Sequence, residues 1–147
     1  MSSEIYSIYD TIWYDNNIYT STQTFNQNIG STSFAVEFDV LPSANNSQCW
    51  FRIGVNNSNT LLVGLIYSTQ QGIRVRSNGT DIATEYVSTR AVVGETSHIK
   101  FTYEDGVMTY NDGDETITLT NTTITPTQIL NCTISNAELS NIKLYTI

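Results

Sequence analysis

The stretch FAVEFDV, residues 34–40, carries two acidic side chains that could act together. Its large apolar residues occupy alternate positions, which is the period of a β-strand, so Glu37 and Asp39 would share the opposite face. A retaining glycosidase needs two carboxyl groups about 5.5 Å apart, one as nucleophile and one as acid. The simpler interpretation is that both carboxylates lie on the solvated face of a half-buried strand.

Two further groups of residues could move a proton or bind a metal. His98 is the single histidine, and without a matching Ser, Cys or Asp arrangement it forms neither a triad nor an ordinary metal site. The segment NDGDE contains Asp112 and Asp114, whose oxygens suit calcium. Its Asp-Gly pair also suits a tight hairpin turn. Calcium therefore stays an open candidate, and no other cofactor is predicted.

The strongest candidate for ligand binding is a predicted face with aromatic and basic side chains. In CWFRIGV, Trp50 and Arg52 alternate with apolar residues, and in GIRVR, Arg74 and Arg76 do the same. If these strands are neighbours, they place an indole among guanidinium donors. Sugars bind such surfaces by stacking on the aromatic ring and by accepting bidentate hydrogen bonds, and arginines would also suit acidic sugars.

The predicted ligand-binding set also includes Glu37 and Asp39, but a second interpretation remains open. These two carboxylates, together with Glu85, could pair with the arginines across strands, each pair contributing only a few tenths of a kcal/mol. Trp50 could also be covered by the N-terminal segment or by another subunit. The exposure of Trp50 decides between a binding surface and a packed one.

These residues lie in a chain that reads almost entirely as short strands. Apolar residues recur every second position, and the turn pairs Asn78-Gly79, Asp105-Gly106 and Asp112-Gly113 separate the predicted strands. The segment TQIL, residues 127–130, is predicted to be a short helical turn. The spacing favours an antiparallel β-sandwich, and residues 1–147 are predicted to form one domain.

Composition and charge limit the partners. The net charge of −8 repels phosphate, so nucleic acid and anionic membranes are not expected partners. No stretch approaches the ~20 apolar residues of a membrane span, and no signal peptide opens the chain. Cys49 and Cys132 could form a disulfide or remain free and buried. Charged residues are only 14%, and hydroxyl and amide side chains replace them, as in many extracellular and virion β-proteins.

From about Ser33 onward the order of segments SFAVEFDV, FRIGV, LLVGLIY, GIRVRSNG, HIKFTYEDGVMTYNDGDETITL and ELSNIKLYTI resembles the concanavalin A-like lectin and glucanase superfamily, including laminin-G-like modules. The resemblance implies a jelly-roll sandwich of two curved sheets. Glucanases of this fold carry Glu-x-Asp-x-(x)-Glu on one strand. Glu37 and Asp39 match the first half, but Leu41 and Pro42 stand where the acid should be, so enzymatic activity is not expected.

We therefore expect a non-enzymatic carbohydrate-binding or adhesion module whose partner is a cell-surface glycan. Its setting is expected to be extracellular or in a virion, as part of a phage or virus tail fibre, a baseplate or a surface adhesin. One alternative is a structural virion protein that contacts other subunits, either as a homo-oligomer or in a larger assembly. A glycan-cleaving enzyme on the same fold is the third interpretation.

Overall fold

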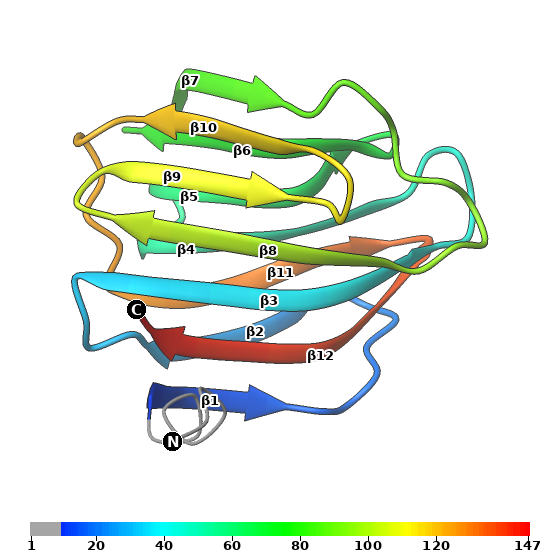
Figure 1. The fold of residues 1–147 in the computed structure, drawn as a ribbon, viewed down its shortest axis with the longest axis horizontal. Coiled ribbons are helices and arrows are strands. Elements are labelled where there is room, and N and C mark those ends of the chain that lie inside the picture. Colours follow the sequence, from blue (N-terminus) through cyan, green and yellow to red (C-terminus); the bar gives the residue numbers. More distant parts are fainter. Residues whose placement is uncertain (1–9) are drawn as a thin grey trace.

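The computed structural model describes residues 10–147, and these form two antiparallel sheets of six strands each (Figure 1). Sheet A contains, in spatial order, β1 (Thr11–Asp15), β12 (Ala137–Thr146), β3 (Ser33–Pro42), β8 (Ser97–Glu104), β9 (Val107–Asn111) and β10 (Thr116–Thr120). Sheet B contains β2 (Gln23–Asn28), β11 (Gln128–Ser135), β4 (Gln48–Asn56), β5 (Asn59–Tyr67), β6 (Gln70–Ser77) and β7 (Thr80–Tyr86).

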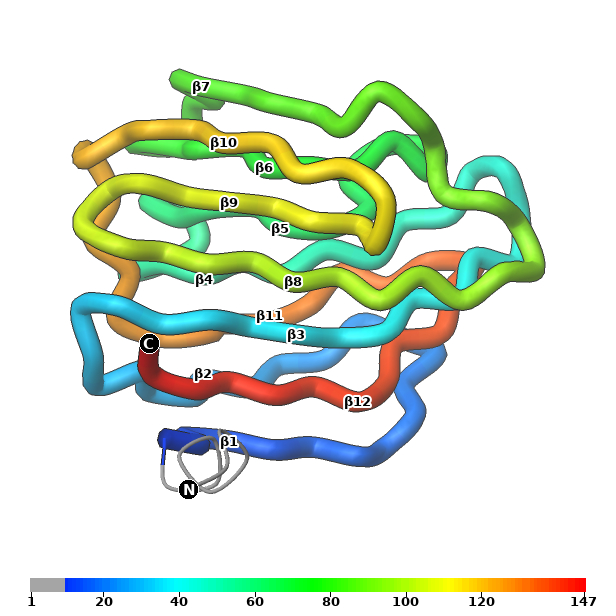
Figure 2. The backbone as a smooth tube through the Cα atoms, in the orientation of Figure 1, coloured from blue at the N-terminus to red at the C-terminus, as the bar shows by residue number. Residues whose placement is uncertain are grey.

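The path of the chain confirms the predicted jelly-roll sandwich. Strands β4 to β7 follow one another across sheet B, and strands β8 to β10 follow one another across sheet A (Figure 2). The other strands alternate between the sheets, so that β12 lies between β1 and β3 while β11 lies between β2 and β4. Every strand pairing is antiparallel.

The predicted turn pairs connect neighbouring strands as expected. Asn78 and Gly79 join β6 to β7 with φ angles of 51° and 79°, and Asp105 and Gly106 join β8 to β9 with φ angles of 46° and 81°. Two consecutive positive φ angles match the right-handed twist of the flanking strands in a two-residue hairpin. These turns fix the register, and the register decides which side chains face the core.

The core lies between the two sheets and confirms the predicted alternation. The ring of Phe38 on β3 contacts the ring of Phe51 on β4 at a centroid distance of 4.9 Å, which joins the two layers. The alternation in CWFRIGV also predicts that its last residue, Val55, faces inward with Cys49, Phe51 and Ile53, but Val55 is 48% exposed. The pairing of β4 with β5 is irregular between Gly54 and Asn56, and such a bulge turns the following side chain to the other face.

Strand β11 and its neighbour β4 decide two further questions from the sequence: the predicted helical turn and the state of the two cysteines. The prediction of a short helical turn at residues 127–130 is wrong: residues 128–130 belong to β11, whose backbone is paired on both sides, with β2 and with β4. Cys49 on β4 and Cys132 on β11 are both buried free cysteines, with their sulfur atoms 4.0 Å apart. They pack as small apolar side chains on adjacent strands.

Gly64 on β5 has a backbone conformation that other residues rarely adopt. Its φ angle is +133°, and a Cβ atom at this position would overlap the carbonyl oxygen of Cys49 on the adjacent strand. The neighbouring position in β6 is also a glycine, Gly72. Sheet B therefore contains two adjacent positions without side chains, and its strands pack closely at this point.

We predict that Gly64→Ala lowers the free energy of unfolding by about 3 kcal/mol, because it combines a strained φ angle with a clash against the backbone. Gly79→Ala is the matched control, since Gly79 also has a positive φ but has open space around it. Gly79→Ala should lower the free energy of unfolding, measured by urea denaturation, by only about 1 kcal/mol. Equal losses for the two variants would contradict this account of Gly64.

Candidate ligand-binding face

The residues predicted to bind a ligand lie on two different surfaces. Trp50 and Arg52 on β4 alternate with core residues of sheet B, so they lie on its outer face, and the arginines of β6 share that face through the ladder of β4, β5 and β6. Glu37 and Asp39 lie on β3 in sheet A. The sandwich core separates the two groups, so the predicted set does not form a single site.

Trp50 is on the predicted side of the strand but is not an exposed platform. Only 9% of the residue is exposed, and it forms a small apolar cluster with Leu62, Ile66 and Tyr86. Gly64 and Gly72 lie between Trp50 and Tyr86 in the same row across the strands. Since neither glycine has a side chain, the aromatic residues can cover this row, and the prediction of an open stacking surface is wrong.

Arg52 lies over Trp50 and has few partners of its own. The central carbon of its guanidinium is 4.6 Å from the centre of the Trp50 ring, in the range of a cation–π contact. One terminal nitrogen donates a long hydrogen bond of 3.4 Å to the side-chain oxygen of Asn131 on β11. Within residues 10–147, Arg52 forms no ion pair with a carboxylate, and its buried Nε has no acceptor.

Arg74 and Arg76 share a single carboxylate partner, Asp81 on β7. Arg76 Nε lies 2.9 Å from one Asp81 oxygen, and an Arg74 nitrogen lies 3.5 Å from the other. Arg74 Nε also donates a 2.6 Å hydrogen bond to the Tyr86 hydroxyl. The cross-strand partner is therefore Asp81 rather than the three carboxylates considered from the sequence, namely Glu37, Asp39 and Glu85.

This surface, which we call the arginine face, consists of Trp50, Arg52, Leu62, Arg74, Arg76, Asp81, Tyr86 and Asn131. Burial lowers the pKa of Arg52, and the nearby charge of Arg76 lowers it further. The guanidinium still keeps its charge at neutral pH, because an arginine starts from a pKa above 12. Three guanidinium groups against one carboxylate leave a local positive excess on a chain whose net charge is −8.

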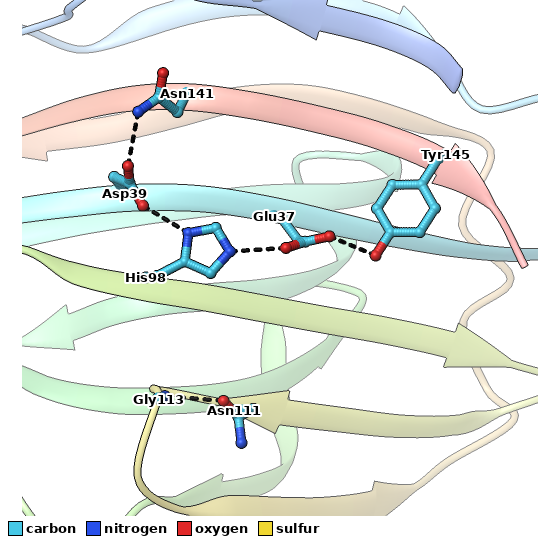
Figure 3. Close-up of polar contacts among 7 residues, drawn as sticks. All are labelled: Glu37, Asp39, His98, Asn111, Gly113, Asn141 and Tyr145. Carbon is cyan, nitrogen blue, oxygen red and sulfur yellow. Dashed lines mark hydrogen bonds and ion pairs between the residues drawn. The ribbon is translucent and has the colours of Figure 1, made fainter. Parts of the chain in front are cut away.

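The outer face of sheet A carries a hydrogen-bonded network centred on His98 (Figure 3). His98 lies on β8, which pairs with β3, so its ring reaches both predicted acids: Nδ1 is 2.6 Å from Asp39 Oδ1, and Nε2 is 2.7 Å from Glu37 Oε1. The Tyr145 hydroxyl donates to the second Glu37 oxygen at 2.5 Å, and the Asn141 amide donates to the second Asp39 oxygen at 2.7 Å.

The protonation states in this network follow from its geometry. Burial acts to lower the pKa of His98, but the hydrogen bonds and charges of Glu37 and Asp39 outweigh it and raise the pKa above 6.5. Burial acts to raise the pKa of Glu37, but Tyr145, His98 and Lys100 together lower it. A glycosidase acid must hold a proton near neutral pH, so the lowered pKa of Glu37 does not suit that residue to the role of the acid.

The calcium candidates lie in the turn between β9 and β10, where Asp112 acts as a turn residue. Its Oδ1 accepts the backbone N–H groups of Asp114 and Glu115 at 2.9 and 2.7 Å, and its Oδ2 accepts a 3.2 Å hydrogen bond from Gln71. Within residues 10–147, no group of three or more His, Cys, Asp or Glu side chains is placed to hold a metal ion.

Sequence reasoning missed the three members of the arginine face that form hydrogen bonds or ion pairs with the arginines: Asp81, Tyr86 and Asn131. They lie on β7 and β11, and their relation to Arg74 and Arg52 depends on which strands are neighbours. The hairpin signal Asn78-Gly79 implies that β6 pairs with β7, so Asp81 could have been placed opposite Arg76. Tyr86 could not, because the bulge between Val75 and Arg76 shifts the register and brings Tyr86 opposite Gly72. Nothing in the sequence places Asn131 beside Arg52, because 79 residues separate them.

Solved structures of lectins and carbohydrate-binding modules share this fold. The chain aligns with the carbohydrate-binding module CBM66 from Bacillus subtilis at a TM-score of 0.68 and 11% identity, covering 91% of each chain. The galectin LEC-6 from Caenorhabditis elegans gives 0.66 and 9% identity, over 89% of this chain and 94% of that one. Congerin II with bound lactose and MES gives 0.58 and 12%, over 88% and 99%.

The described residues thus have the concanavalin A-like jelly-roll fold that the sequence resemblance implied. No protein-family model and no curated protein matches this chain in sequence. The described part of the chain also contains no helix that is long and apolar enough to cross a membrane.

We predict that the His98 network stabilises the fold in a defined pH window. The pKa of His98 is raised on folding, so its contribution is complete below about pH 6.5 and is lost as pH rises through the folded value. The pKa of Glu37 is lowered, so its contribution is lost as pH falls below about 4.5. His98→Gln should therefore reduce the free energy of unfolding more at pH 5.5 than at pH 9.

The difference should be at most about 1 kcal/mol, because the His98 side chain is 55% exposed and solvent screens its charge. Urea denaturation of the parent and the variant at both pH values measures it. Tyr145→Phe, which removes one hydrogen bond but leaves the histidine ion pairs, should lower stability with a smaller pH dependence. A His98→Gln effect that is equal at both pH values would contradict the assigned imidazolium.

Proposed function

We propose that this chain is a non-enzymatic carbohydrate-binding module and that the arginine face is its binding surface. The observation that carries the proposal is that Arg52, Arg74 and Arg76 bring three partly exposed guanidinium groups to a single sheet face. These groups donate several hydrogen bonds from a fixed surface, which suits the adjacent oxygens of a sugar. The lectins and modules with the same fold, one of them holding lactose, support a saccharide as the ligand class.

The mode of binding differs from stacking on an exposed tryptophan. Trp50 is covered, so it supports Arg52 from below, while Tyr86 is the partly exposed aromatic residue of the face. The Arg74 guanidinium lies 5.6 Å from the centre of the Tyr86 ring and also bonds its hydroxyl. Arginine and tyrosine therefore hold each other in place before a ligand arrives, which lowers the entropy cost of binding.

The glycan-cleaving alternative has weaker support. Its candidate acids, Glu37 and Asp39, both contact the same imidazolium on the other sheet. The low content of charged side chains supports an extracellular or virion setting, such as a tail fibre, a baseplate or an adhesin that binds a cell-surface glycan. These settings are part of the proposal and rest on composition and on analogy between folds.

Arg74→Ala should weaken binding to any glycan that the parent protein retains on an array by about tenfold or more, because charge-assisted hydrogen bonds contribute about 1.5–3 kcal/mol. Lys143→Ala, which removes an equal charge from the outer face of sheet A, is the matched control and should bind as the parent does. Circular dichroism confirms that each variant is folded.

Three results would count against the proposal. Retention of no glycan by the parent would remove carbohydrate binding, and full binding by a folded Arg74→Ala variant would remove the arginine face from the site. Release of reducing sugar from a bound polysaccharide, abolished by Glu37→Gln, would restore the enzymatic alternative.

A further inference from the structure

We infer that the arginine face selects anionic saccharides, and that Arg52 is the group that recognises the ligand's carboxylate or sulfate. This inference rests on the proposed function and names the ligand class of the same surface. Its basis is an imbalance between donors and acceptors: this face has more positive charge and more N–H groups than the protein's own side chains can match.

The three arginines differ in the partners that balance their charge. Arg74 and Arg76 both reach Asp81, so the single carboxylate of the face is already shared. Arg52 has no carboxylate partner within the described residues, and its acceptor is the neutral amide of Asn131 at 3.4 Å. Its proximity to Arg76 adds repulsion, which is one cause of its lowered pKa. An anion bound beside Arg52 would relieve that repulsion.

The unmatched donors lie at the same point. Within residues 10–147, the buried side-chain nitrogens and oxygens without a hydrogen-bond partner are two N–H groups, Arg52 Nε and Trp50 Nε1. Their side chains are in contact, with the guanidinium over the indole ring. Buried donors without acceptors cost free energy, so Arg52 is held with less hydrogen bonding than its guanidinium can form. Because Arg52 as a whole is partly exposed, a ligand that brings acceptor oxygens can reach the rest of this guanidinium.

The net charge of −8 does not prevent such binding. At physiological ionic strength, charges more than about 8 Å from the ligand are largely screened. The bound anion therefore responds mainly to the three guanidinium groups and to Asp81. A planar carboxylate or a sulfate matches the fork of an arginine through two parallel hydrogen bonds, whereas a neutral hydroxyl forms weaker single bonds.

The experiment compares matched glycans on one array: neutral oligosaccharides and the same backbones bearing a uronic or sialic carboxylate or a sulfate ester. The parent should bind anionic glycans at least tenfold more strongly than their neutral counterparts, and binding should weaken as sodium chloride rises from about 50 to about 500 mM. The carboxylated and sulfated arms show which anion is preferred.

Two variants of Arg52 and one control variant test whether Arg52 is responsible for the preference for anionic glycans. Arg52→Ala should lose about tenfold or more in affinity for the anionic glycans and little for neutral ones. Arg52→Lys should lose less, because it keeps the charge but not the fork. Lys143→Ala removes one positive charge from the opposite sheet and should bind as the parent does, which separates local recognition from net charge.

The outcomes distinguish the inference from the proposed function. Equal binding of neutral and anionic glycans, or anionic binding that survives Arg52→Ala, overturns the inference while leaving carbohydrate binding in place. Binding of no glycan by the folded parent protein overturns both.

Discussion

The antiparallel ladder of sheet B is the constraint on which the rest of the structure depends. The core needs every second residue of β4, β5 and β6 for its apolar layer, so the remaining residues must lie outside. The register then places Arg52, Leu62 and Arg74 in one row across three strands. Packing of the interior thus determines which side chains share the exterior, and a one-residue slip would exchange the two faces.

The outer faces of the two sheets differ in how completely their charged side chains are paired. On sheet A, His98 and four neighbours satisfy one another, and each carboxylate oxygen of Glu37 and Asp39 accepts a hydrogen bond. On sheet B, the Asp81 carboxylate pairs with both Arg74 and Arg76, and among the described residues the only hydrogen-bond acceptor of Arg52 is the Asn131 side-chain amide. A satisfied network stabilises the fold, whereas a surface with unmatched donors retains capacity for a ligand. This contrast is why we assign binding to sheet B.

Local sequence signals were sufficient for most strands, for the Asn-Gly and Asp-Gly turns and for the side of most strands that faces the core. They failed at the start of β11, which was predicted to be helical, and at Val55, which a bulge turns outward. They were not sufficient for contacts between distant strands. Trp50 is covered because Gly64 and Gly72 leave its row without side chains and Tyr86 packs in the same cluster, which requires the pairing of four strands. Glu37 and His98 are 61 residues apart in the sequence, so the local sequence around either residue does not predict their hydrogen bond.

Chemical-shift mapping tests the central claim most directly, because it locates the ligand without assuming the site. The backbone amides and the indole N–H groups of the labelled protein would be followed while an anionic oligosaccharide identified on the array is added. Our account predicts that the largest changes fall on β4, β6 and β7 and on the indole N–H of Trp50. Changes confined to the outer face of sheet A, or to the loops at the ends of the sandwich, would contradict it.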